Sequence, residues 1–506
     1  MIEKSIKRNI SASILLQVIF VVISGVIGIA IVPVIIRHVG KITFGILELI
    51  LTLELINAFF EFGFGSTVVK YTLEFIRKDK NEFNTFIWTF IYIKIILSVI
   101  VVFIVLLLGL NFEHIFKDIP DQQVNSIRIS IVIYCAGLLL KNFVDVFDNI
   151  LRGIIRYDLS IIANLSSRIL YFFIVFLLFR IKIDAGIIEL SFLSFIITPL
   201  SKGVLIGLFF KKLKTGFNII PQKFSKIILS KTFHFMGGIS LISIIAQVYN
   251  QGIKFVLGMI SNPLAVAYFG IANRIRSPIL QIDDSILRPL IPAGTVIWNT
   301  ESRSSEIVFK YTRLQASIII GLSVFILAFI TKFIHLWLGE GYKEVSTIIT
   351  IFVIPFVLPS FGVLLMFYYA TGKTKLSMYL NTLNTICALF LSIILQKYFG
   401  LIGFVIGISI TQIIISIMGM VVYCREYRIS IIDYLKYGYG KIYLILIFLS
   451  LFLFILLKYI EIDNWFKFLF ISGITGILYL FLLVIFIYQS EYTKFKKYLI
   501  LSFKRR

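Results

Sequence analysis

The stretch VPVIIRHVGKITFGILELI, residues 32–50, recurs in weaker form as LGMISNPLAVAYFGIANRI, residues 257–275. The two stretches align without a gap, and the alignment places the Phe-Gly-Ile triplet at 44–46 on the same triplet at 269–271. Each copy lies where one apolar run ends and the next begins. Duplicated helix sets are typical of transporters, so we infer that each copy marks the junction between the first and second helix of a repeated set.

A second, shorter match supports the repeat. LRGIIRYDLS at 151–160 resembles ATGKTKLS at 370–377, and each carries a glycine in the polar turn before a fifth helix. We therefore predict two related six-helix lobes, residues 1–215 and 216–425. An even number of helices brings both lobes into the membrane from the same side, which makes the repeat parallel. Residues 426–506 hold two further helices and a basic tail that have no counterpart.

Composition places the chain in a membrane. Of its 506 residues 59% are hydrophobic, and the mean hydropathy is +0.98. Soluble domains have roughly 45–50% apolar residues, and one membrane span needs about 20 apolar residues in a row. The sequence predicts an all-α polytopic membrane protein with about 14 transmembrane helices, in two six-helix lobes related by a parallel repeat plus two extra C-terminal helices. The predicted spans are 10–36, 42–64, 83–110, 122–148, 160–180, 186–210, 232–260, 264–290, 306–331, 345–370, 376–397, 401–424, 441–459 and 464–489.

The positive charge follows the predicted topology. The net charge is +23, and most of the 49 lysines and arginines fall in alternate polar segments, beginning with the N-terminal one. By the positive-inside rule both termini are expected in the cytoplasm, which requires an even number of spans. The basicity is thus explained by topology and by contact with anionic lipid, and we expect no nucleic-acid partner.

Motifs for catalysis and metal binding are missing from the sequence. The three cysteines and four histidines are dispersed without metal-ligand spacing, and there is no GxxxxGK[ST] phosphate loop or nucleophile elbow. The adjacent Asp283-Asp284 pair does not form the DxD motif of a sugar-nucleotide transferase. We predict a transporter rather than an enzyme, with no catalytic residue, no metal and no cofactor.

Among the cations that lie in predicted spans, five are candidates for binding an anionic substrate. A charge in hydrocarbon costs at least a few kcal/mol, so a residue of this kind is a functional candidate. The five are Lys94, Arg168, Lys254, Arg274 and Arg276. For Lys254 the alternative is that its long stem reaches the nearby membrane surface. Together these side chains predict a polar cavity that handles an anion.

Three carboxylates are candidates for binding a coupling ion or for gating. Glu54, Asn57 and Glu61 share one face of the second predicted helix, and Asp284 lies on the eighth. We predict that Glu54, Glu61 or Asp284 binds H+ or Na+, or pairs with a cation in one conformation only. An internal ion pair or a protonated carboxyl is the alternative for Glu54. Glu61 is equally well explained as a helix-end residue, and Asp284 as a solvated one.

Several stretches together resemble a known family. They are PVIIRHVGKITFGILELI, FEFGFGSTVVKY, KFSKIILSKTFHF, VYNQGIKFVLGMI and VAYFGIANRIRSPILQIDDSILRPLIPA. The chain resembles the polysaccharide transporters of the multidrug/oligosaccharidyl-lipid/polysaccharide exporter superfamily, which include O-antigen and capsular repeat-unit flippases, and it is similar to lipid II flippases. The resemblance covers essentially the whole chain in helix number, order and sidedness.

This resemblance implies a function. Such proteins have two lobes around a central cationic cavity, and flip undecaprenyl-pyrophosphate-linked oligosaccharides from the inner to the outer leaflet of the bacterial cytoplasmic membrane. The implied partners are the lipid-linked oligosaccharide, membrane lipid, a coupling ion (H+ or Na+), and a polysaccharide polymerase with other assembly proteins. Basic residues on the first, second and eighth helices of related lipid II flippases meet the pyrophosphate. Arg274 and Arg276 match them on the eighth helix, but the second helix of this chain carries glutamates. The last two helices of the family shelter a lipid tail.

A position in the seventh helix also departs from the family pattern. An Asp followed by Arg or Lys often occurs there in the seventh helix, and this chain reads NQGIK at 250–254. The cation is present as Lys254, and the acid is missing. A cation-coupled multidrug antiporter of the same superfamily is the first alternative, although such proteins usually have twelve helices and a less basic pocket. A membrane glycan polymerase or acyltransferase is the second, and would be expected to show a larger outer loop or a clustered histidine site.

Overall fold

The computed structural model describes residues 2–61, 63–181, 185–213, 220–291, 294 and 304–487, and it contains helices and no strand within them. In a bilayer every backbone N–H and C=O group needs a partner inside the protein, and a helix provides one within its own segment. The predicted all-α membrane fold is confirmed. The chain forms two compact units, Met1–Arg274 and Ile275–Arg506, which are described separately. The division at 215 and 425 stays a prediction.

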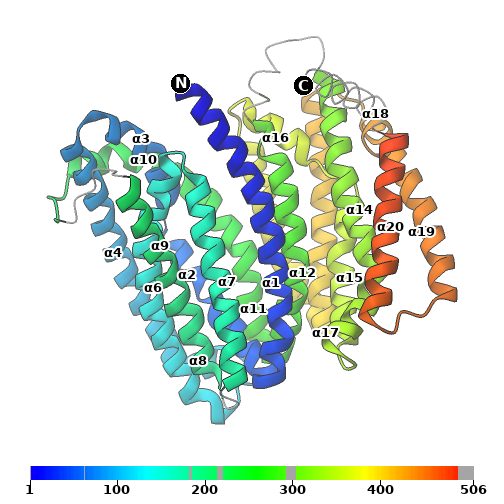
Figure 1. Cartoon of the computed structure of the whole chain (residues 1–506), viewed down its shortest axis with the longest axis horizontal. Coiled ribbons are helices and arrows are strands. Elements are labelled where there is room, and N and C mark those ends of the chain that lie inside the picture. Colours follow the sequence, from blue (N-terminus) through cyan, green and yellow to red (C-terminus); the bar gives the residue numbers. More distant parts are fainter. Residues whose placement is uncertain are drawn as a thin grey trace, which may run out of the picture. The chain divides into compact units, whose positions relative to one another are not determined.

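The first unit contains the N-terminal helices (Figure 1). Three short turns of other helical type connect them, namely the 3-10 turn η1 (Asp121–Gln123) and the π-helical turns η2 (Leu193–Ile197) and η3 (Val248–Gly252). The α-helices are α1 (Ile2–Thr52), α2 (Glu54–Phe59), α3 (Phe64–Lys78), α4 (Lys80–Leu110), α5 (Phe112–Ile115), α6 (Val124–Gly153), α7 (Tyr157–Ile181), α8 (Ile187–Phe192), α9 (Thr198–Leu213), α10 (Lys226–Gln247), α11 (Ile253–Ile260) and α12 (Pro263–Leu287), the last of which continues into the second unit.

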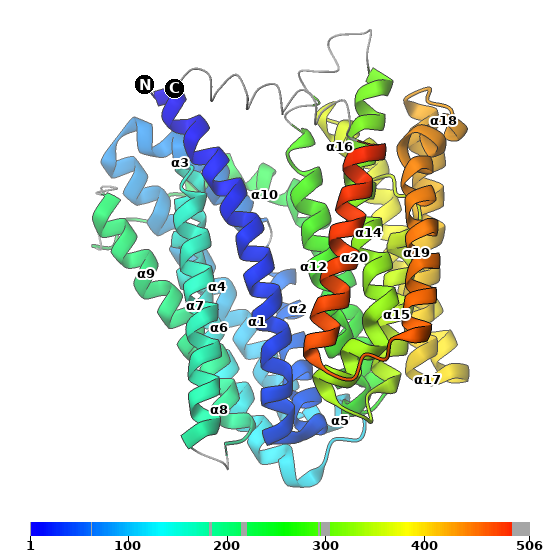
Figure 2. The same cartoon turned by 45° about the vertical axis from the view of Figure 1, so that its right-hand side comes forward.

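The second unit contains the remaining helices (Figure 2). Its π-helical turn η4 (Lys436–Gly440) joins α18 to α19. The helices are α14 (Ser304–Leu338), α15 (Lys343–Val357), α16 (Gly362–Ala370), α17 (Lys375–Glu426), α18 (Ile431–Leu435), α19 (Lys441–Tyr459) and α20 (Trp465–Phe486).

The number of spans agrees with the sequence analysis in part. Among the described residues, nine helices are long and apolar enough to cross a membrane, or ten if the bent pair α15 and α16 is one span. Helices α1 and α17 each run through a glycine with non-helical backbone, Gly40 (φ 81°) and Gly400 (φ 58°). Both glycines lie where the sequence analysis separates two spans. Fourteen spans are consistent with this arrangement, and the exact number stays a prediction.

Helix α6 is at the centre of the first unit, where it packs against α3, α4, α8 and α9 (Figure 1). Buried phenylalanines of α3 and α4, including Phe64, Phe86 and Phe90, form much of the core beside it. Burying one such side chain contributes on the order of 1.5–3 kcal/mol in water-soluble proteins, but apolar side chains gain little in lipid. Close packing of these rings is therefore what holds the helices of this unit together.

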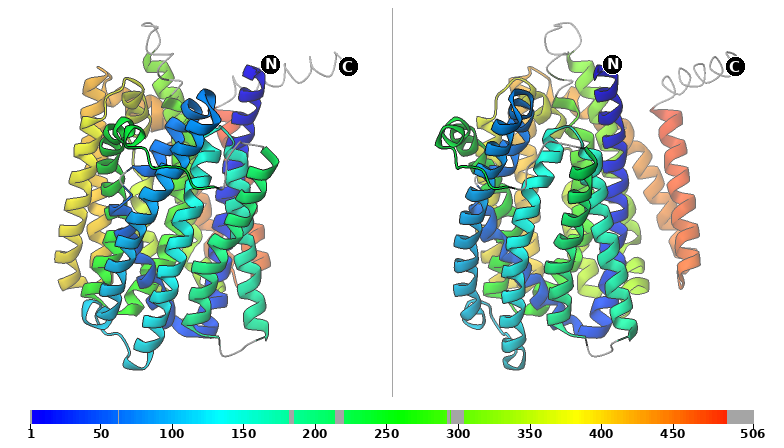
Figure 3. Two further views of the ribbon diagram at one scale, coloured as in Figure 1. Left: turned by 90° about the vertical axis from the view of Figure 1, so that its left-hand side faces the viewer. Right: turned by 60° about the vertical axis from the view of Figure 1, so that its left-hand side comes forward.

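The extra helix pair belongs to the second unit. Helices α19 and α20 lie side by side and both contact α14 (Figures 2 and 3). Three tyrosines of this region donate hydrogen bonds to the break between α15 and α16, where the chain bends by 56°. Tyr434 and Tyr439 both donate to the carbonyl of Ser360 (2.8 and 2.9 Å), and Tyr443 donates to that of Val357 (2.8 Å). These bonds satisfy carbonyls that the bend releases from helical bonding.

Two glycines allow close contact between α1, α11 and α12 in the first unit. A Cβ atom at Gly45 in α1 would lie 1.9 Å from the carbonyl oxygen of Pro263, at the start of α12. A Cβ atom at Gly258 in α11 would lie 2.2 Å from Cδ2 of Leu49. Only hydrogen fits at both positions. The glycine of the repeated Phe-Gly-Ile triplet is thus a packing requirement of the first unit.

We predict that Gly45→Ala destabilises the protein by about 2–3 kcal/mol, because the added methyl group meets backbone rather than a movable side chain. Thermal unfolding in detergent measures the change. Gly28→Ala in the same helix is the matched control, since a Cβ atom there has no neighbour within 4 Å. Equal unfolding temperatures for the two variants would contradict this account of the contact.

Tyr443→Phe is expected to cost about 1–2 kcal/mol, since it leaves the Val357 carbonyl without its donor in an apolar setting. Tyr459→Phe at the other end of α19 is the control, because that side chain is 79% exposed. A thermal unfolding curve for each variant makes the comparison. If the two substitutions cost the same, the hydroxyl of Tyr443 does not support the bend.

Candidate functional site

The Glu48 carboxylate lies at the centre of a cluster of cations in the first unit. Its Oε2 accepts a hydrogen bond from Lys254 Nζ at 2.7 Å, and its Oε1 accepts one from Arg274 Nη2 at 2.8 Å. The side chains of Glu48 and Lys254 are 7% and 9% exposed, whereas that of Arg274 is 28% exposed. Charge-assisted bonds of this length are among the strongest hydrogen bonds in proteins.

Two glycines and a π-helical turn position the Glu48 carboxylate. A Cβ atom at Gly270 would lie 3.0 Å from the Glu48 carboxyl carbon, so the glycine leaves room for the carboxylate against α12. Gly258 brings α11 against α1 beside Glu48. The π-helical turn η3 ends at Gly252, two residues before Lys254. Turns of this kind often occur at functional sites.

Arg168 adds a further positive charge near Arg274. It lies on α7, its guanidinium carbon is 5.1 Å from the centre of the Phe20 ring, and the positive charges of Arg168 and Arg274 repel each other. Glu48, Lys254, Arg274 and Arg168 are called the Glu48 cluster below. Its three cations outnumber its single carboxylate, so the cluster carries a net positive charge of two. Arg168 is exposed and Arg274 is partly exposed, so this excess of positive charge is accessible to an anion.

Three of the predicted cations thus lie together, and the sequence analysis missed their partner. Glu48 lies in the same ILELILTLELINAFFEFGFG stretch that drew attention to Glu54 and Glu61, but on a different face of the helix. A search for a carboxylate on the helix face opposite Glu54, Asn57 and Glu61 would have found Glu48. Lys254 is held inside the unit by Glu48, so the alternative in which its stem reaches the membrane surface does not fit this geometry.

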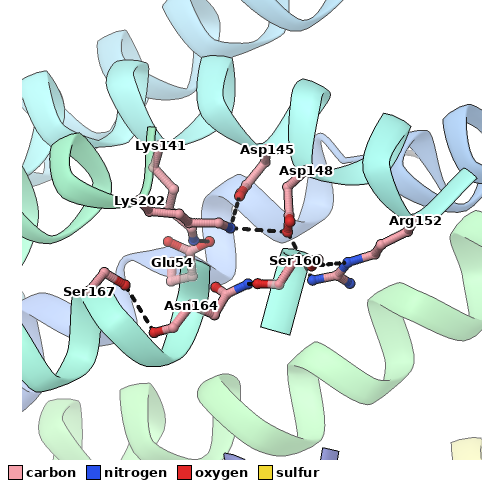
Figure 4. A network of polar contacts seen from close by, with 9 residues as sticks. All are labelled: Glu54, Lys141, Asp145, Asp148, Arg152, Ser160, Asn164, Ser167 and Lys202. Carbon is pink, nitrogen blue, oxygen red and sulfur yellow. Dashed lines mark hydrogen bonds and ion pairs between the residues drawn. The ribbon is translucent and has the colours of Figure 1, made fainter. Parts of the chain in front are cut away.

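A second group of charges surrounds α6 (Figure 4). Lys202 of α9 bonds to Asp145 at 2.9 Å and to Asp148 at 3.1 Å. Arg152 bonds to Asp148 at 2.9 Å and to the Ser160 hydroxyl at 3.0 Å. Lys141, Asp145, Asp148 and Arg152 are spaced by four, three and four residues along one stripe of α6. With Glu54 and Lys202 they form what is called the Asp148 network below.

The predicted residues Glu54, Lys94 and Glu61 belong to this second region. Glu54 accepts hydrogen bonds from Lys141 (2.6 Å), Asn57 (2.8 Å) and Tyr134 (3.2 Å). It therefore forms the internal ion pair that was its alternative explanation. Lys94 is buried, its ammonium lies 5.3 Å from the centre of the Phe64 ring, and it interacts electrostatically with Glu61, Asp145 and Glu54.

The other two predicted residues lie in the second unit. Arg276 is 7% exposed, donates to Gln412 Oε1 at 3.4 Å, and has its guanidinium carbon 5.3 Å from the centre of the Phe352 ring. Asp284 forms a 2.9 Å ion pair with Arg288, in which both side chains are more than half exposed. The pair is the solvated arrangement that was the alternative for Asp284. In the part of the chain that the structure describes, no three His, Cys, Asp or Glu side chains lie together as metal ligands.

The chain shares its fold with several solved membrane transporters. The lipid II flippase MurJ in its inward closed conformation is 16% identical with a TM-score of 0.70, covering 94% of this chain and 99% of that one. An inward-facing multidrug resistance MATE family transporter of the MOP superfamily is 17% identical with a TM-score of 0.63, covering 83% and 96%. An outward-facing conformation of a MATE family transporter of the same superfamily is 15% identical with a TM-score of 0.54, covering 83% and 96%. At these identities the likeness shows the fold alone.

The chain is a multi-pass membrane protein with the fold of these transporters. A family model described as polysaccharide biosynthesis protein matches residues 6–298. The chain therefore belongs to the polysaccharide biosynthesis protein family, and the predicted resemblance is confirmed. Among curated proteins, none matches the chain.

We predict that Asp148→Asn destabilises the protein by about 2 kcal/mol, because Lys202 and Arg152 lose a carboxylate whose side chain is only 4% exposed. Thermal unfolding in detergent measures the effect. Asp284→Asn is the matched control, since breaking an exposed i,i+4 ion pair is expected to cost less than about 0.5 kcal/mol. Should Asp148→Asn be as stable as the control, the Asp148 network does not hold α6, α7 and α9 together.

Proposed function

We propose that the protein is a flippase that moves an undecaprenyl-pyrophosphate-linked oligosaccharide from the inner to the outer leaflet of the bacterial cytoplasmic membrane by alternating access. The oligosaccharide would be a cell-surface repeat unit, such as that of an O-antigen or capsule, or a related glycan. The family description supports polysaccharide synthesis as the process, and the fold shared with a lipid II flippase supports a lipid-linked substrate.

The observation that carries the proposal is the excess of cations around Glu48. Lys254 and Arg274 share one carboxylate, and Arg168 lies near Arg274. A pyrophosphate diester carries two negative charges, equal to the excess positive charge of the Glu48 cluster. Guanidinium groups bind phosphate oxygens through charge-assisted hydrogen bonds, which are stronger in a partly dry site than in water.

The same cluster makes the alternative of a cation-coupled multidrug antiporter less suitable. Both oxygens of Glu48 already accept a hydrogen bond from a cation. An organic cation would have to displace Lys254 or Arg274 and would meet the remaining positive charges. An anionic group is attracted by the same positive charges.

The other predicted residues enter the proposal as parts of the transport cycle. The Glu54–Lys141 ion pair would form in one conformation and open in the other, with Glu61 and Lys94 in the same region. Binding of H+ or Na+ to Glu54 would then compete with Lys141 and couple an ion to the cycle. Arg276 and Asp284 stay predictions for pyrophosphate contact and for gating.

The setting of the protein follows from its predicted substrate. Both termini would lie in the cytoplasm, where the lipid-linked unit is made, and the prenyl tail would stay in lipid beside α19 and α20. A polysaccharide polymerase and other assembly proteins would receive the unit on the outer side. Transport requires no covalent chemistry, so the proposal needs no cofactor.

The test is translocation of a fluorescent undecaprenyl-pyrophosphate oligosaccharide in proteoliposomes. Wild type is expected to move the lipid, and Arg274→Ala at a matched protein level is expected to lower the rate at least about tenfold, as loss of a charge-assisted contact worth about 1.5–3 kcal/mol predicts. Arg180→Ala is the matched control, because it removes an exposed arginine of the same unit that has no role in the proposal.

Two results would contradict the proposal. Equal rates for Arg274→Ala and Arg180→Ala would remove Arg274 from the site. Failure of wild type on several such lipids, together with export of organic cations against an ion gradient, would favour the multidrug antiporter.

A further inference from the structure

We infer that Glu48 is an internal competitor of the substrate for Arg274, and that Lys254 controls this competition without touching the substrate. The inference rests on the proposed function, and it gives the residues of the Glu48 cluster different roles. Arg274 and Arg168 bind the pyrophosphate. Glu48 and Lys254 form a neutral pair, which determines how readily Arg274 leaves Glu48 and binds the pyrophosphate.

Burial separates the two cations that share Glu48. The side chains of Lys254 and Glu48 are 9% and 7% exposed, and their atoms are 2.7 Å apart. The Arg274 side chain is 28% exposed, three times as much as that of Lys254. An anion that approaches the cluster from the accessible side therefore meets Arg274 before Lys254. Breaking the Lys254–Glu48 pair instead would strand a buried charge, which typically costs about 3–5 kcal/mol.

The hydrogen-bond donors of Arg274 are only partly used. Its Nη2 donates to Glu48, and its Nη1 lies 3.4 Å from the carbonyl oxygen of Gly28. Its Nε is buried and, among the described residues, has no hydrogen-bond partner. A guanidinium has five N–H donors, so this side chain has capacity for phosphate oxygens. The ammonium of Lys254, by contrast, is enclosed with its carboxylate.

Charge balance agrees with this division. The pair of Lys254 and Glu48 is neutral, which leaves Arg274 and Arg168 with two positive charges for the two negative charges of a pyrophosphate diester. The charged and titratable groups that face Glu48 are Lys254 from α11, Arg274 from α12 and the Tyr171 hydroxyl from α7. Of these three groups, we expect only Arg274 to contact the substrate.

The competition makes a specific prediction about single and double substitutions. Removing Lys254 leaves Glu48 with Arg274 as its sole cation, so the carboxylate holds Arg274 more tightly and the substrate binds less well. Removing Glu48 frees Arg274, so the substrate binds better. Removing both residues also frees Arg274. A loss caused by Lys254→Met should therefore be rescued by Glu48→Gln, which cannot happen if Lys254 is itself a ligand of the pyrophosphate.

The experiment is equilibrium binding of farnesyl-pyrophosphoryl-glucose, a soluble pyrophosphate diester, to the full chain in lipid nanodiscs. The proteins compared are wild type, Lys254→Met, Glu48→Gln, the double variant and Arg274→Ala. We expect Lys254→Met to weaken binding about tenfold, Glu48→Gln to strengthen it about tenfold, and the double variant to bind at least as well as wild type. Arg274→Ala should abolish measurable binding.

Two controls separate this competition from general charge effects and from misfolding. Asp158→Asn removes one negative charge from the same unit at a residue that pairs with Arg156 and not with Arg274, so its affinity should equal that of wild type. Thermal unfolding without ligand identifies any variant that is not folded. If Glu48→Gln is not folded, Glu48→Asp replaces it. Its shorter side chain weakens the hold on Arg274, so binding should again be stronger than in wild type.

The outcomes are distinguishable. If wild type binds the probe and Arg274→Ala does not, but the double variant binds as poorly as Lys254→Met, then Lys254 is a direct ligand and this inference is overturned while the proposed function stands. The same holds if Glu48→Gln or a substituted Glu48→Asp fails to strengthen binding. If wild type does not bind the probe, both the inference and the proposed function are overturned.

Discussion

The first unit depends on a carboxylate that would be unstable alone in an apolar setting. Glu48 is buried among α1, α11 and α12, and two cations and the space beside Gly270 make that burial tolerable. Removing one partner of a buried ion pair is costly because the other charge is left unpaired. The positions of three helices are therefore linked through one side chain, and anything that competes for its cations acts on all three.

The two groups of charges in this unit differ in the balance of their signs. In the Asp148 network Glu54, Asp145 and Asp148 face Lys141, Lys202 and Arg152, so the ionic contacts compensate one another and tie α2, α6 and α9 together. In the Glu48 cluster the cations exceed the carboxylate. We attribute a structural role to Asp145, Asp148 and their cations, a gating role to the Glu54–Lys141 pair, and a substrate-binding role to the unbalanced group. The difference between the two groups depends on which cation pairs with which carboxylate. The number of charges in a span does not reveal this pairing.

Apolar run lengths predicted the class of fold, because a span of about 20 residues has few structural options in lipid. The sequence also predicted that Lys254, Arg168 and Arg274 bind an anionic substrate together, because a cation is costly in hydrocarbon and is therefore a functional candidate. It did not predict Glu48, because the faces of α1 that meet α11 and α12 are determined by contacts at Gly45, Gly258 and Gly270 that sequence periodicity does not specify. The sequence analysis grouped Lys94 with Lys254 as a candidate for substrate binding. In the structure Lys94 interacts electrostatically with Glu61, Asp145 and Glu54, and its role in binding stays a prediction.

A high-resolution cryo-electron microscopy structure with farnesyl-pyrophosphoryl-glucose bound tests the account most directly, through two distances at Glu48. The account predicts that the 2.7 Å contact with Lys254 persists, while the 2.8 Å contact with Arg274 is lost and phosphate oxygens take its place. An intact Glu48–Arg274 contact with the ligand bound elsewhere would contradict it, as would phosphate oxygens bonded to Lys254.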